Sequence, residues 1–205
     1  MTIKVFSLYW DNIDDRIPHY QKKVMDMHGI PINQHKINGF DHGSWMDWVM
    51  LREEHTDVIL FMDIDCVVVA KHNVESMLHQ AHLGTLFGAA GASNHLDKER
   101  DYAGAWFIGI PRNYWMALNQ PSSKPSMYCD TAQNVTDAWR KYNLPLHIVN
   151  PNTVEVPKWD LPGKPLAYGI GTTYGDICYH LFESRESDNI ERFVNKCKGI
   201  LGEAI

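Results

Sequence analysis

Two aspartates interrupt a long apolar stretch in the first half of the chain. The apolar run Val58–Met62 precedes Asp63 and Asp65, which are one residue apart, and Val67–Val69 resumes the run. The first run predicts a buried strand. Because an unpaired ionised carboxylate strongly resists burial, we expect both aspartates at the carboxyl end of that strand, where open α/β sheets bind ligands.

The spacing of Asp63 and Asp65 predicts a shared cation. Side chains two residues apart on an extended backbone point the same way, and paired carboxylates are hard oxygen ligands that suit Mg²⁺ or Mn²⁺. The alternative is that both aspartates are solvated turn residues or helix caps. Against a turn, no Gly, Pro, Asn or Ser follows them before Asn73.

The first 70 residues alternate between strand and helix patterns. In order, we expect a strand at Thr2–Tyr9, a helix capped by Asp14-Asp15 and stopped by Gly29, a strand at Ile30–Ile37, a helix capped by Ser44 and running to about His55, and the strand before Asp63. Strands that alternate with helices in this way pair in parallel through helical crossovers.

The remaining residues continue the mixture of strands and helices. We expect a helix at Val74–Ala81, a strand at Thr85–Ala90, a polar loop at Ala92–Tyr102, a strand at Ala105–Ile110, a helix opened by Pro111, a loop at Gln120–Tyr128, a helix capped by Asp130 and running to Tyr142, a last clear strand at Leu146–Val149, irregular structure at Pro151–Tyr174, and a helix at Asp188–Leu201. The length suits one sizeable core. We therefore predict a single α/β domain with a mainly parallel central sheet flanked by helices.

Composition and charge exclude several classes of partner. The formal net charge of −6 gives no electrostatic basis for binding a nucleic-acid backbone. No apolar run reaches membrane-spanning length, and Met1–Val5 shows no charged leader, so we expect neither a membrane span nor an export signal. The four cysteines are widely spaced, which indicates reduced thiols of a cytoplasmic protein.

A site with two carboxylates needs a further ligand, and His180 is our candidate among the eleven histidines. The glycine-containing segment Gly171–Gly175 leads to it, and Arg185 follows five residues later. The imidazole suits a metal and the guanidinium suits a phosphate. The alternative is that His180 and Arg185 only fix a surface loop.

These motifs resemble those of the GT-A-fold glycosyltransferases. The resemblance rests on the apolar strand that ends at Asp63–Asp65, the second apolar run, and the distant His180 within Tyr179–Arg185. Three further segments agree with it, namely Leu8–Trp10, His42–Asp47 and Tyr102–Gly109. Asp130, at the head of a later helix, matches a place where many of these enzymes keep an acidic residue.

The resemblance implies a fold and an activity. It implies one Rossmann-like GT-A domain over residues 1–205, with a nucleotide-binding half at 1–70 and an acceptor-binding, metal-completing half at 71–205. The implied activity is that of a metal-dependent glycosyltransferase, which uses Mn²⁺ or Mg²⁺ and a nucleoside-diphosphate sugar of UDP or GDP type. The implied acceptor is a glycan, a protein or a small molecule.

The resemblance also implies roles for individual residues. Asp63, Asp65 and His180 are expected at the metal, with Asp63 contacting the donor ribose or a metal-bound water. Tyr9, Trp10, Asp47 and Ile64 are expected around the nucleotide sugar, Arg16 and Arg185 at phosphate, and Asp130 as the base or the acceptor-orienting group. Structural roles stay open as alternatives: Tyr9 and Trp10 as core aromatics, Asp47 and Arg16 as surface residues, and Asp130 as a helix N-cap.

Two other functions fit parts of the sequence. Asp63–Val67 also matches the D-x-D-x-[TV] string of haloacid-dehalogenase-type phosphatases, in which the first aspartate is the nucleophile and the second is the general acid. Those enzymes carry the string on their first strand, whereas two strand–helix units precede it here. The second alternative is a non-catalytic module that binds a nucleotide sugar or a glycan. The sequence also departs from the GT-A pattern at Glu183, because some of these enzymes place a glycine next to the phosphates at this position.

Overall fold

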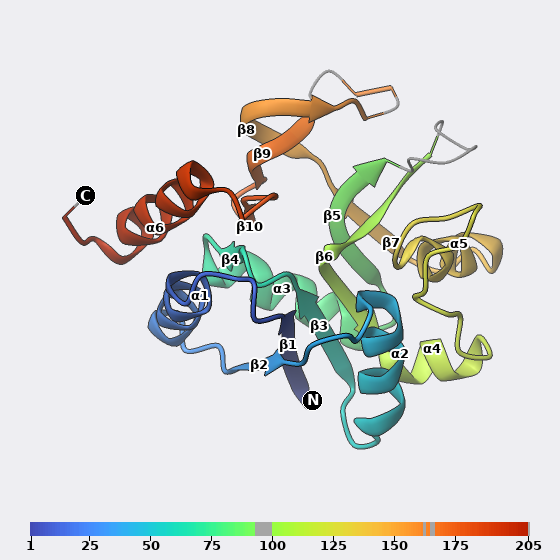
Figure 1. Cartoon of the computed structure of the whole chain (residues 1–205). Coiled ribbons are helices and arrows are strands. Elements are labelled where there is room, and N and C mark those ends of the chain that lie inside the picture. Colours follow the sequence, from blue (N-terminus) through green and yellow to red (C-terminus); the bar gives the residue numbers. More distant parts are fainter. Residues whose placement is uncertain (93–99, 162, 165–166, 205) are drawn as a thin grey trace.

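The computed structural model describes residues 1–92, 100–161, 163–164 and 167–204 of the chain (Figure 1). The helices and strands are, in order, β1 (Ile3–Tyr9), α1 (Arg16–Met27), β2 (Ile32–Lys36), α2 (His42–Arg52), β3 (Val58–Met62), β4 (Cys66–Val68), α3 (Lys71–His82), β5 (Leu86–Ala92), β6 (Asp101–Pro111), α4 (Arg112–Ala117), α5 (Gln133–Lys141), β7 (Leu146–Val149), β8 (Pro151–Trp159), β9 (Tyr168–Tyr174), β10 (Cys178–His180) and α6 (Ser187–Leu201).

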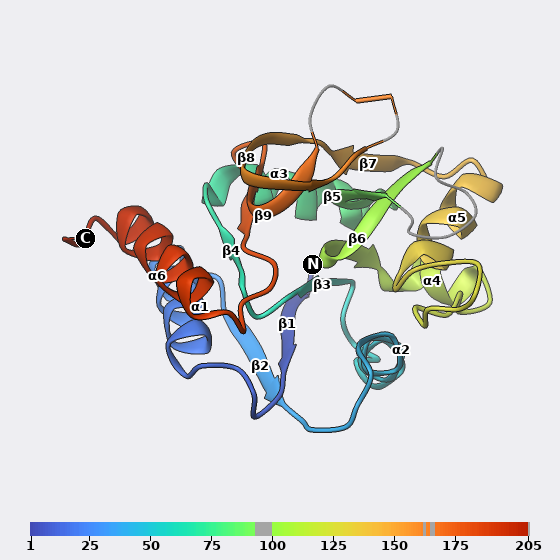
Figure 2. The same ribbon diagram turned by 45° about the horizontal axis from the view of Figure 1, so that its top comes forward.

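A six-stranded sheet in the order β2-β1-β3-β6-β5-β7 forms the centre of the molecule (Figures 1 and 2). β1 pairs in parallel with β2 and β3, and β5 pairs in parallel with β7, whereas β6 runs antiparallel to its neighbours β3 and β5. The predicted mainly parallel sheet flanked by helices is confirmed. Parallel pairing brings the carboxyl ends of β1, β2 and β3 to one edge of the sheet.

The central sheet is buried on both faces, and β3 shows how the sequence encodes this. All five of its residues are buried. Ile59 and Phe61 point toward one apolar cluster, built with α2, α4 and α5, while Leu60 points to another, built with α1 and α3. Because strand side chains alternate between faces, a strand covered on both sides reads as a continuous apolar run.

A second, antiparallel sheet has the order β4-β10-β9-β8. The prediction of irregular structure at Pro151–Tyr174 is therefore wrong for β8 and β9. The strand predicted at Leu146–Val149 is confirmed as β7, but it is not the last strand. Pro151 and Pro157 stand where the β8–β9 register shifts, which is where a ladder tolerates proline. A Cβ at Gly169 would lie 2.3 Å from the Val156 carbonyl oxygen, so glycine permits this close strand approach. Most β8 side chains are exposed, so the strand lacks an apolar signature.

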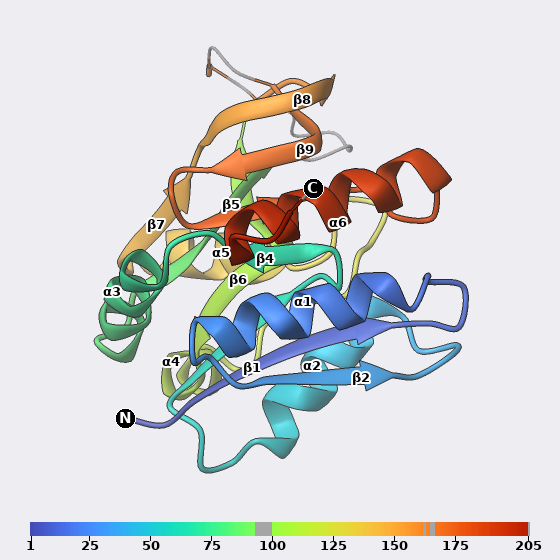
Figure 3. The ribbon, with the colours of Figure 1, turned by 90° about the vertical axis from the view of Figure 1, so that its left-hand side faces the viewer.

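Helices α1 and α6 lie side by side and pack against the second sheet (Figure 3). Their shared apolar cluster includes Ile17 and Val24 of α1, Phe193 of α6, and Val67 and Tyr179 of β4 and β10. This packing ties the two ends of the chain to the segment that follows Asp63. It also fixes β10, the strand that carries His180, beside β4.

Four predicted helix starts differ from the structure. Helix α3 begins at Lys71, three residues before the predicted Val74. Asp41, not Ser44, caps α2, because its side chain accepts a hydrogen bond from the Ser44 amide at 2.8 Å. Pro111 precedes α4 as its N-cap residue instead of occupying the first helical position. Asp130 is not the N-cap of α5; that place belongs to Ala132, in the left-handed region at φ 65°.

The four cysteines Cys66, Cys129, Cys178 and Cys197 are free and buried, as expected for reduced thiols. Within the described residues, no helix combines the length and apolar character that crossing a bilayer requires. Most of the predicted loop at Ala92–Tyr102 (residues 93–99) lies outside the described residues, and its last two residues belong to β6.

Candidate metal centre

Asp63 and Asp65 lie in a tight turn between the two sheets. β3 ends at Met62, β4 begins at Cys66, and the Cys66 amide donates to the Asp63 carbonyl at 3.0 Å, which closes a four-residue turn. The extended backbone that we expected between the aspartates is therefore absent at this turn. The turn and the shared cation site, treated as alternatives from the sequence, are compatible.

A buried glutamine holds this turn from α1. The Gln21 Nε2 donates to the Asp63 carbonyl at 2.7 Å and to the Cys66 carbonyl at 2.8 Å, and Gln34 in turn donates to Gln21 Oε1 at 3.0 Å. The Asp63 amide donates to the Trp106 carbonyl of β6 at 3.0 Å. Backbone groups that would otherwise be unpaired in the interior are thus satisfied, and the turn is fixed from two sides.

His180 reaches the turn because β10 pairs with β4. It lies opposite Cys66 in this ladder, and the next amide, of Leu181, donates to the Asp65 carbonyl at 3.0 Å. The imidazole is almost fully buried. Trp106 stacks on it with ring centroids 5.7 Å apart and an interplanar angle of 14°, and the Phe182 ring centroid lies 3.7 Å away. Aromatic packing therefore holds the ring in one orientation.

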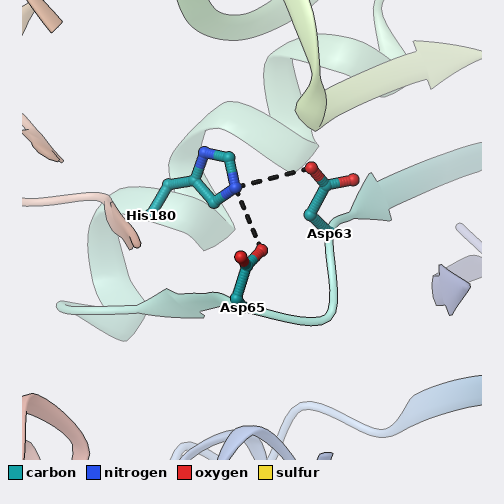
Figure 4. Close-up of side chains that lie close together, drawn as sticks. All are labelled: Asp63, Asp65 and His180. Atoms are coloured by element: carbon teal, nitrogen blue, oxygen red, sulfur yellow. Dashed lines mark hydrogen bonds and ion pairs between the residues drawn. The ribbon is translucent and has the colours of Figure 1, made fainter. Parts of the chain in front are cut away.

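The three side chains converge on one point (Figure 4). His180 Nε2 lies 3.1 Å from Asp65 Oδ1 and 3.4 Å from Asp63 Oδ2, and one ligand atom from each residue lies within 4.8 Å of the others. Neighbouring ligand atoms around an octahedral cation bound at about 2.1 Å lie about 3.0 Å apart. The two carboxylates and the imidazole therefore fit a single divalent ion such as Mn²⁺ or Mg²⁺.

The electrostatics of this cluster favour a positive charge at its centre. Burial by itself lowers the pKa of His180, but Asp65 and Asp63 outweigh it and raise this pKa to about 9. Burial likewise acts to raise the pKa of Asp63, yet His42 and His180 hold this pKa below its ordinary value. A proton on His180 therefore supplies the charge that a metal ion also supplies.

A cleft of about 320 Å³ opens beside the cluster, at the carboxyl ends of β1 and β3. Its lining residues are Leu8, Trp10, Ile13, His42, Asp63, Ile64, Asp65, Glu183, Ser184, Arg185 and Glu186. We call it the metal-side cleft. Of the residues expected around a nucleotide sugar, Trp10, Ile64 and Arg185 line it, and the Arg185 guanidinium lies 5.9 Å from the centre of the Trp10 ring.

Tyr9 and Arg16 lie elsewhere. Tyr9 lines a separate cleft of about 530 Å³ together with Asp15, Pro18, His19, Lys22, Lys23, Asp26 and Gln34. We call this one the α1-side cleft. Adjacent residues at the end of a strand point to opposite sides, so Tyr9 and Trp10 face different clefts. Arg16 is at the surface, where it pairs with Asp14 at 2.9 Å and with Glu191.

Asp47 and Asp130 also lie outside the lining of the metal-side cleft. Asp47 accepts hydrogen bonds from the Ser122 hydroxyl at 2.8 Å and the Ser123 amide at 2.7 Å, so it fixes the loop before α5. Asp130 neighbours Tyr102. Burial raises the pKa of Tyr102 well above its ordinary value, and the carboxylates of Asp130 and, more weakly, Asp63 raise this pKa further.

From the sequence, we assigned no site role to His42, Glu183 or Glu186, which line the metal-side cleft. His42 Nδ1 lies 3.5 Å from Asp63 Oδ1. A usable signal was present, because His42 follows β2 and therefore lies at the same sheet edge as Asp63. Glu183 has φ 51°, a left-handed conformation that glycine adopts most easily, although the residue is glutamate.

No protein-family model matches the sequence, and a search of curated proteins finds no match. Among solved structures, the chain is similar to the catalytic domain of Drosophila beta1,4-galactosyltransferase 7 in complex with xylobiose, with 12% identity, a TM-score of 0.51, and coverage of 87% of this chain and 70% of that chain. It is also similar to 4-diphosphocytidyl-2C-methyl-D-erythritol synthase from Anaerococcus prevotii, with 6% identity, a TM-score of 0.51, and coverage of 98% and 99%. At these identities the likeness establishes the fold alone, and it confirms the GT-A-type, Rossmann-like fold expected from the sequence.

Proposed function

We propose that this chain is a metal-dependent glycosyltransferase that moves a sugar from a nucleoside-diphosphate sugar to an acceptor hydroxyl. The observation that carries the proposal is the convergence of Asp63, Asp65 and His180, from distant parts of the chain, beside a cleft at the carboxyl ends of β1 and β3. Asp63, Asp65 and His180 would hold a Mn²⁺ or Mg²⁺ ion, whose positive charge would neutralise the diphosphate leaving group.

The charges of the metal-side cleft make the cation a requirement for donor binding. Four carboxylates line it, from Asp63, Asp65, Glu183 and Glu186, against one guanidinium, from Arg185. A diphosphate is itself anionic and is repelled by this set in a site that water only partly screens. We therefore expect the metal to bind before the donor or together with it.

The remaining lining residues suit the rest of a nucleotide sugar. Leu8, Trp10 and Ile64 offer apolar surface to the nucleoside, and Arg185 offers a guanidinium to the diphosphate. Aromatic and apolar walls with a few polar groups are typical of small-molecule sites. Tyr9, Arg16 and Asp47 receive no donor contact in this proposal, because none of them lines the metal-side cleft.

The transfer itself moves one proton and exchanges one bond. The bond between the anomeric carbon and the phosphate oxygen breaks, its electron pair stays with the diphosphate, and the acceptor oxygen bonds to the same carbon. The acceptor hydroxyl loses its proton to a base, and we propose Asp130 as that base or as the group that orients the acceptor. The carboxylates of Asp130 and Asp63 both raise the pKa of Tyr102, so this tyrosine lies between the proposed base and the aspartate pair.

Three other activities share parts of this site. Phosphatases of the haloacid-dehalogenase type are disfavoured because the aspartate pair follows the third strand of this chain. Nucleotidyl transfer, the kind of chemistry that the diphosphocytidyl group in the name of the Anaerococcus neighbour indicates, needs a nucleoside triphosphate, and the loop after β1 lines the cleft that would hold it. That loop, Trp10–Asp15, holds three aspartates and no glycine, which suits a triphosphate poorly. A non-catalytic module is the third alternative.

A turnover assay distinguishes these activities. We expect slow release of UDP or GDP from a panel of UDP- and GDP-sugars in the presence of Mn²⁺, with the release lost in Asp65→Ala. Donor binding without release supports the non-catalytic module. Hydrolysis of simple phosphate esters supports a phosphatase, and pyrophosphate release from a nucleoside triphosphate and a sugar phosphate supports a nucleotidyltransferase.

A further inference from the structure

His42 is a second imidazole at the aspartate pair. It begins α2, lines the metal-side cleft, and places Nδ1 3.5 Å from Oδ1 of Asp63. His180 Nε2 lies 3.4 Å from the other oxygen of the same carboxylate, Oδ2. Each oxygen of Asp63 is thus faced by a different imidazole, one from each half of the chain.

The position of His42 is set by rigid neighbours. Its ring packs against the fully buried Trp45, with ring centroids 5.6 Å apart and an interplanar angle of 42°. A Cβ at the adjacent Gly43 would lie 2.6 Å from the Ser123 carbonyl oxygen, so the first turn of α2 is pressed against the loop before α5. His42 Nε2 is shielded from solvent and has no hydrogen-bond partner in the described part of the chain. Asp63 is therefore the polar group that His42 faces.

We propose that His42 is a positioning residue of the metal centre: its Nδ1–H donates to Asp63 Oδ1, which leaves Oδ2 to face the cation with Asp65 and His180. The inference rests on the proposed metal-dependent function. A carboxylate held by an outer hydrogen bond presents one oxygen in a fixed direction, and such outer contacts strengthen metal sites. The 3.5 Å contact is longer than a formed N–H···O bond of about 3 Å, so we expect it to shorten when an ion binds.

Calorimetric titration of Mn²⁺ into the nucleotide-free protein tests the positioning role of His42. We expect His42→Ala to weaken Mn²⁺ binding by about 10–100-fold, the usual effect of losing an outer contact at a metal site. His42→Asn should restore affinity to within about threefold of wild type, because the asparagine Nδ2 donates from nearly the position of the histidine Nδ1.

His35→Ala is the matched control. The His35 ring also packs against Trp45, with ring centroids 5.9 Å apart, and the Trp45 Nε1 donates to the His35 Nδ1 at 3.0 Å. His35 does not line the metal-side cleft. This variant should lose thermal stability and keep the wild-type Mn²⁺ affinity. A double-mutant cycle adds a second readout: His42→Ala should cost less affinity in an Asp63→Asn background than in wild type.

The outcomes separate this inference from the proposed function. Mn²⁺ binding by wild type and His42→Ala with equal affinity overturns the role of His42 and leaves the metal centre standing. Equal weakening in His42→Ala and His42→Asn overturns the hydrogen-bond role. Failure of the wild-type protein to bind Mn²⁺ overturns the metal centre and the role of His42 together.

Discussion

Two clefts flank the end of β1, and they differ in how their charges are balanced. In the larger α1-side cleft, Lys22 pairs with Asp26 at 3.0 Å and Lys23 pairs with Glu203. In the smaller metal-side cleft, Asp63 and Asp65 face imidazoles, and no lysine or arginine pairs with them in the part of the chain that the structure describes. At the metal-side cleft the compensating charge is therefore a titratable proton on His180, which a cation can replace, and not a lysine. The kind of charge compensation, not cavity size, distinguishes the two clefts.

Asp65→Asn tests this difference with the largest expected effect. Removing one charged ligand should weaken Mn²⁺-dependent binding of UDP or GDP by at least about 100-fold, at the upper end of effects seen at metal sites. Asp26→Asn in the α1-side cleft is the matched control and should leave binding unchanged, because its pair with Lys22 is exposed. Calorimetry with and without Mn²⁺ measures both; equal affinities for the two variants would remove the distinction between the clefts.

Metal affinity should depend on pH through His180. The metal displaces a proton from a group whose pKa is about 9, so Mn²⁺ affinity should rise by about tenfold per pH unit from near pH 6.5 toward pH 9 and then level off. The stability of the metal-free protein should change with pH in the opposite direction. The stability that the raised pKa of His180 gives is complete below pH 6.5 and is lost as the pH rises through 9. Thermal unfolding across this pH range, with and without Mn²⁺, measures the pH dependence of both the metal affinity and the metal-free stability. A metal affinity that does not vary with pH would contradict the role of His180.

Gln21→Met should lower the free energy of unfolding. It leaves the buried Cys66 carbonyl without the Gln21 donor, at a cost of about 1–3 kcal/mol, whereas the Asp63 carbonyl keeps its hydrogen bond from the Cys66 amide. Urea unfolding measures the loss, and Gln80→Met, at an exposed position of α3, should change stability by less than about 0.5 kcal/mol. A Gln21→Met protein as stable as wild type would show that the turn does not depend on α1.

The smallest expected effect concerns the backbone beside the metal-side cleft. Glu183 adopts φ 51°, where an L-residue is strained by about 1 kcal/mol and glycine is not. Glu183→Gly should therefore be about 1 kcal/mol more stable than Glu183→Ala, since both variants lose the exposed pair with Lys158. Equal stability of the two variants in urea would show that this conformation carries no strain.

The end of β3 and the candidate metal ligands could be predicted from the sequence, because an apolar run marks the strand and the chemistry of a cation site calls for a third ligand. The run before Asp63 is apolar because β3 is covered on both faces, and the two acids end that run. His180 was predicted from the need for a third ligand. Its partner strand, β4, was visible as the apolar run after Asp65. The turn between β3 and β4 was considered only as an alternative to the cation site, because aspartate suits either role and no Gly, Pro, Asn or Ser follows before Asn73.

Other features depend on contacts that no local pattern reveals. β8 exposes most of its side chains and contains two prolines, so only its pairing with β9 identifies it as a strand. His42 becomes relevant only once α2 packs beside β3. The expectation that Tyr9 and Trp10 share one pocket conflicts with strand geometry, which sends neighbouring side chains to opposite sides, and the sequence alone was sufficient to exclude it.

The central claim is that His180 and the two aspartates bind one metal ion. Pulsed electron paramagnetic resonance of Mn²⁺ bound to the protein tests this directly, because it detects nitrogen from a coordinated imidazole. We predict a nitrogen coupling in wild type that disappears in His180→Ala and persists in His42→Ala at saturating Mn²⁺. Bound Mn²⁺ without nitrogen coupling, or a coupling that survives in His180→Ala, would contradict the assignment.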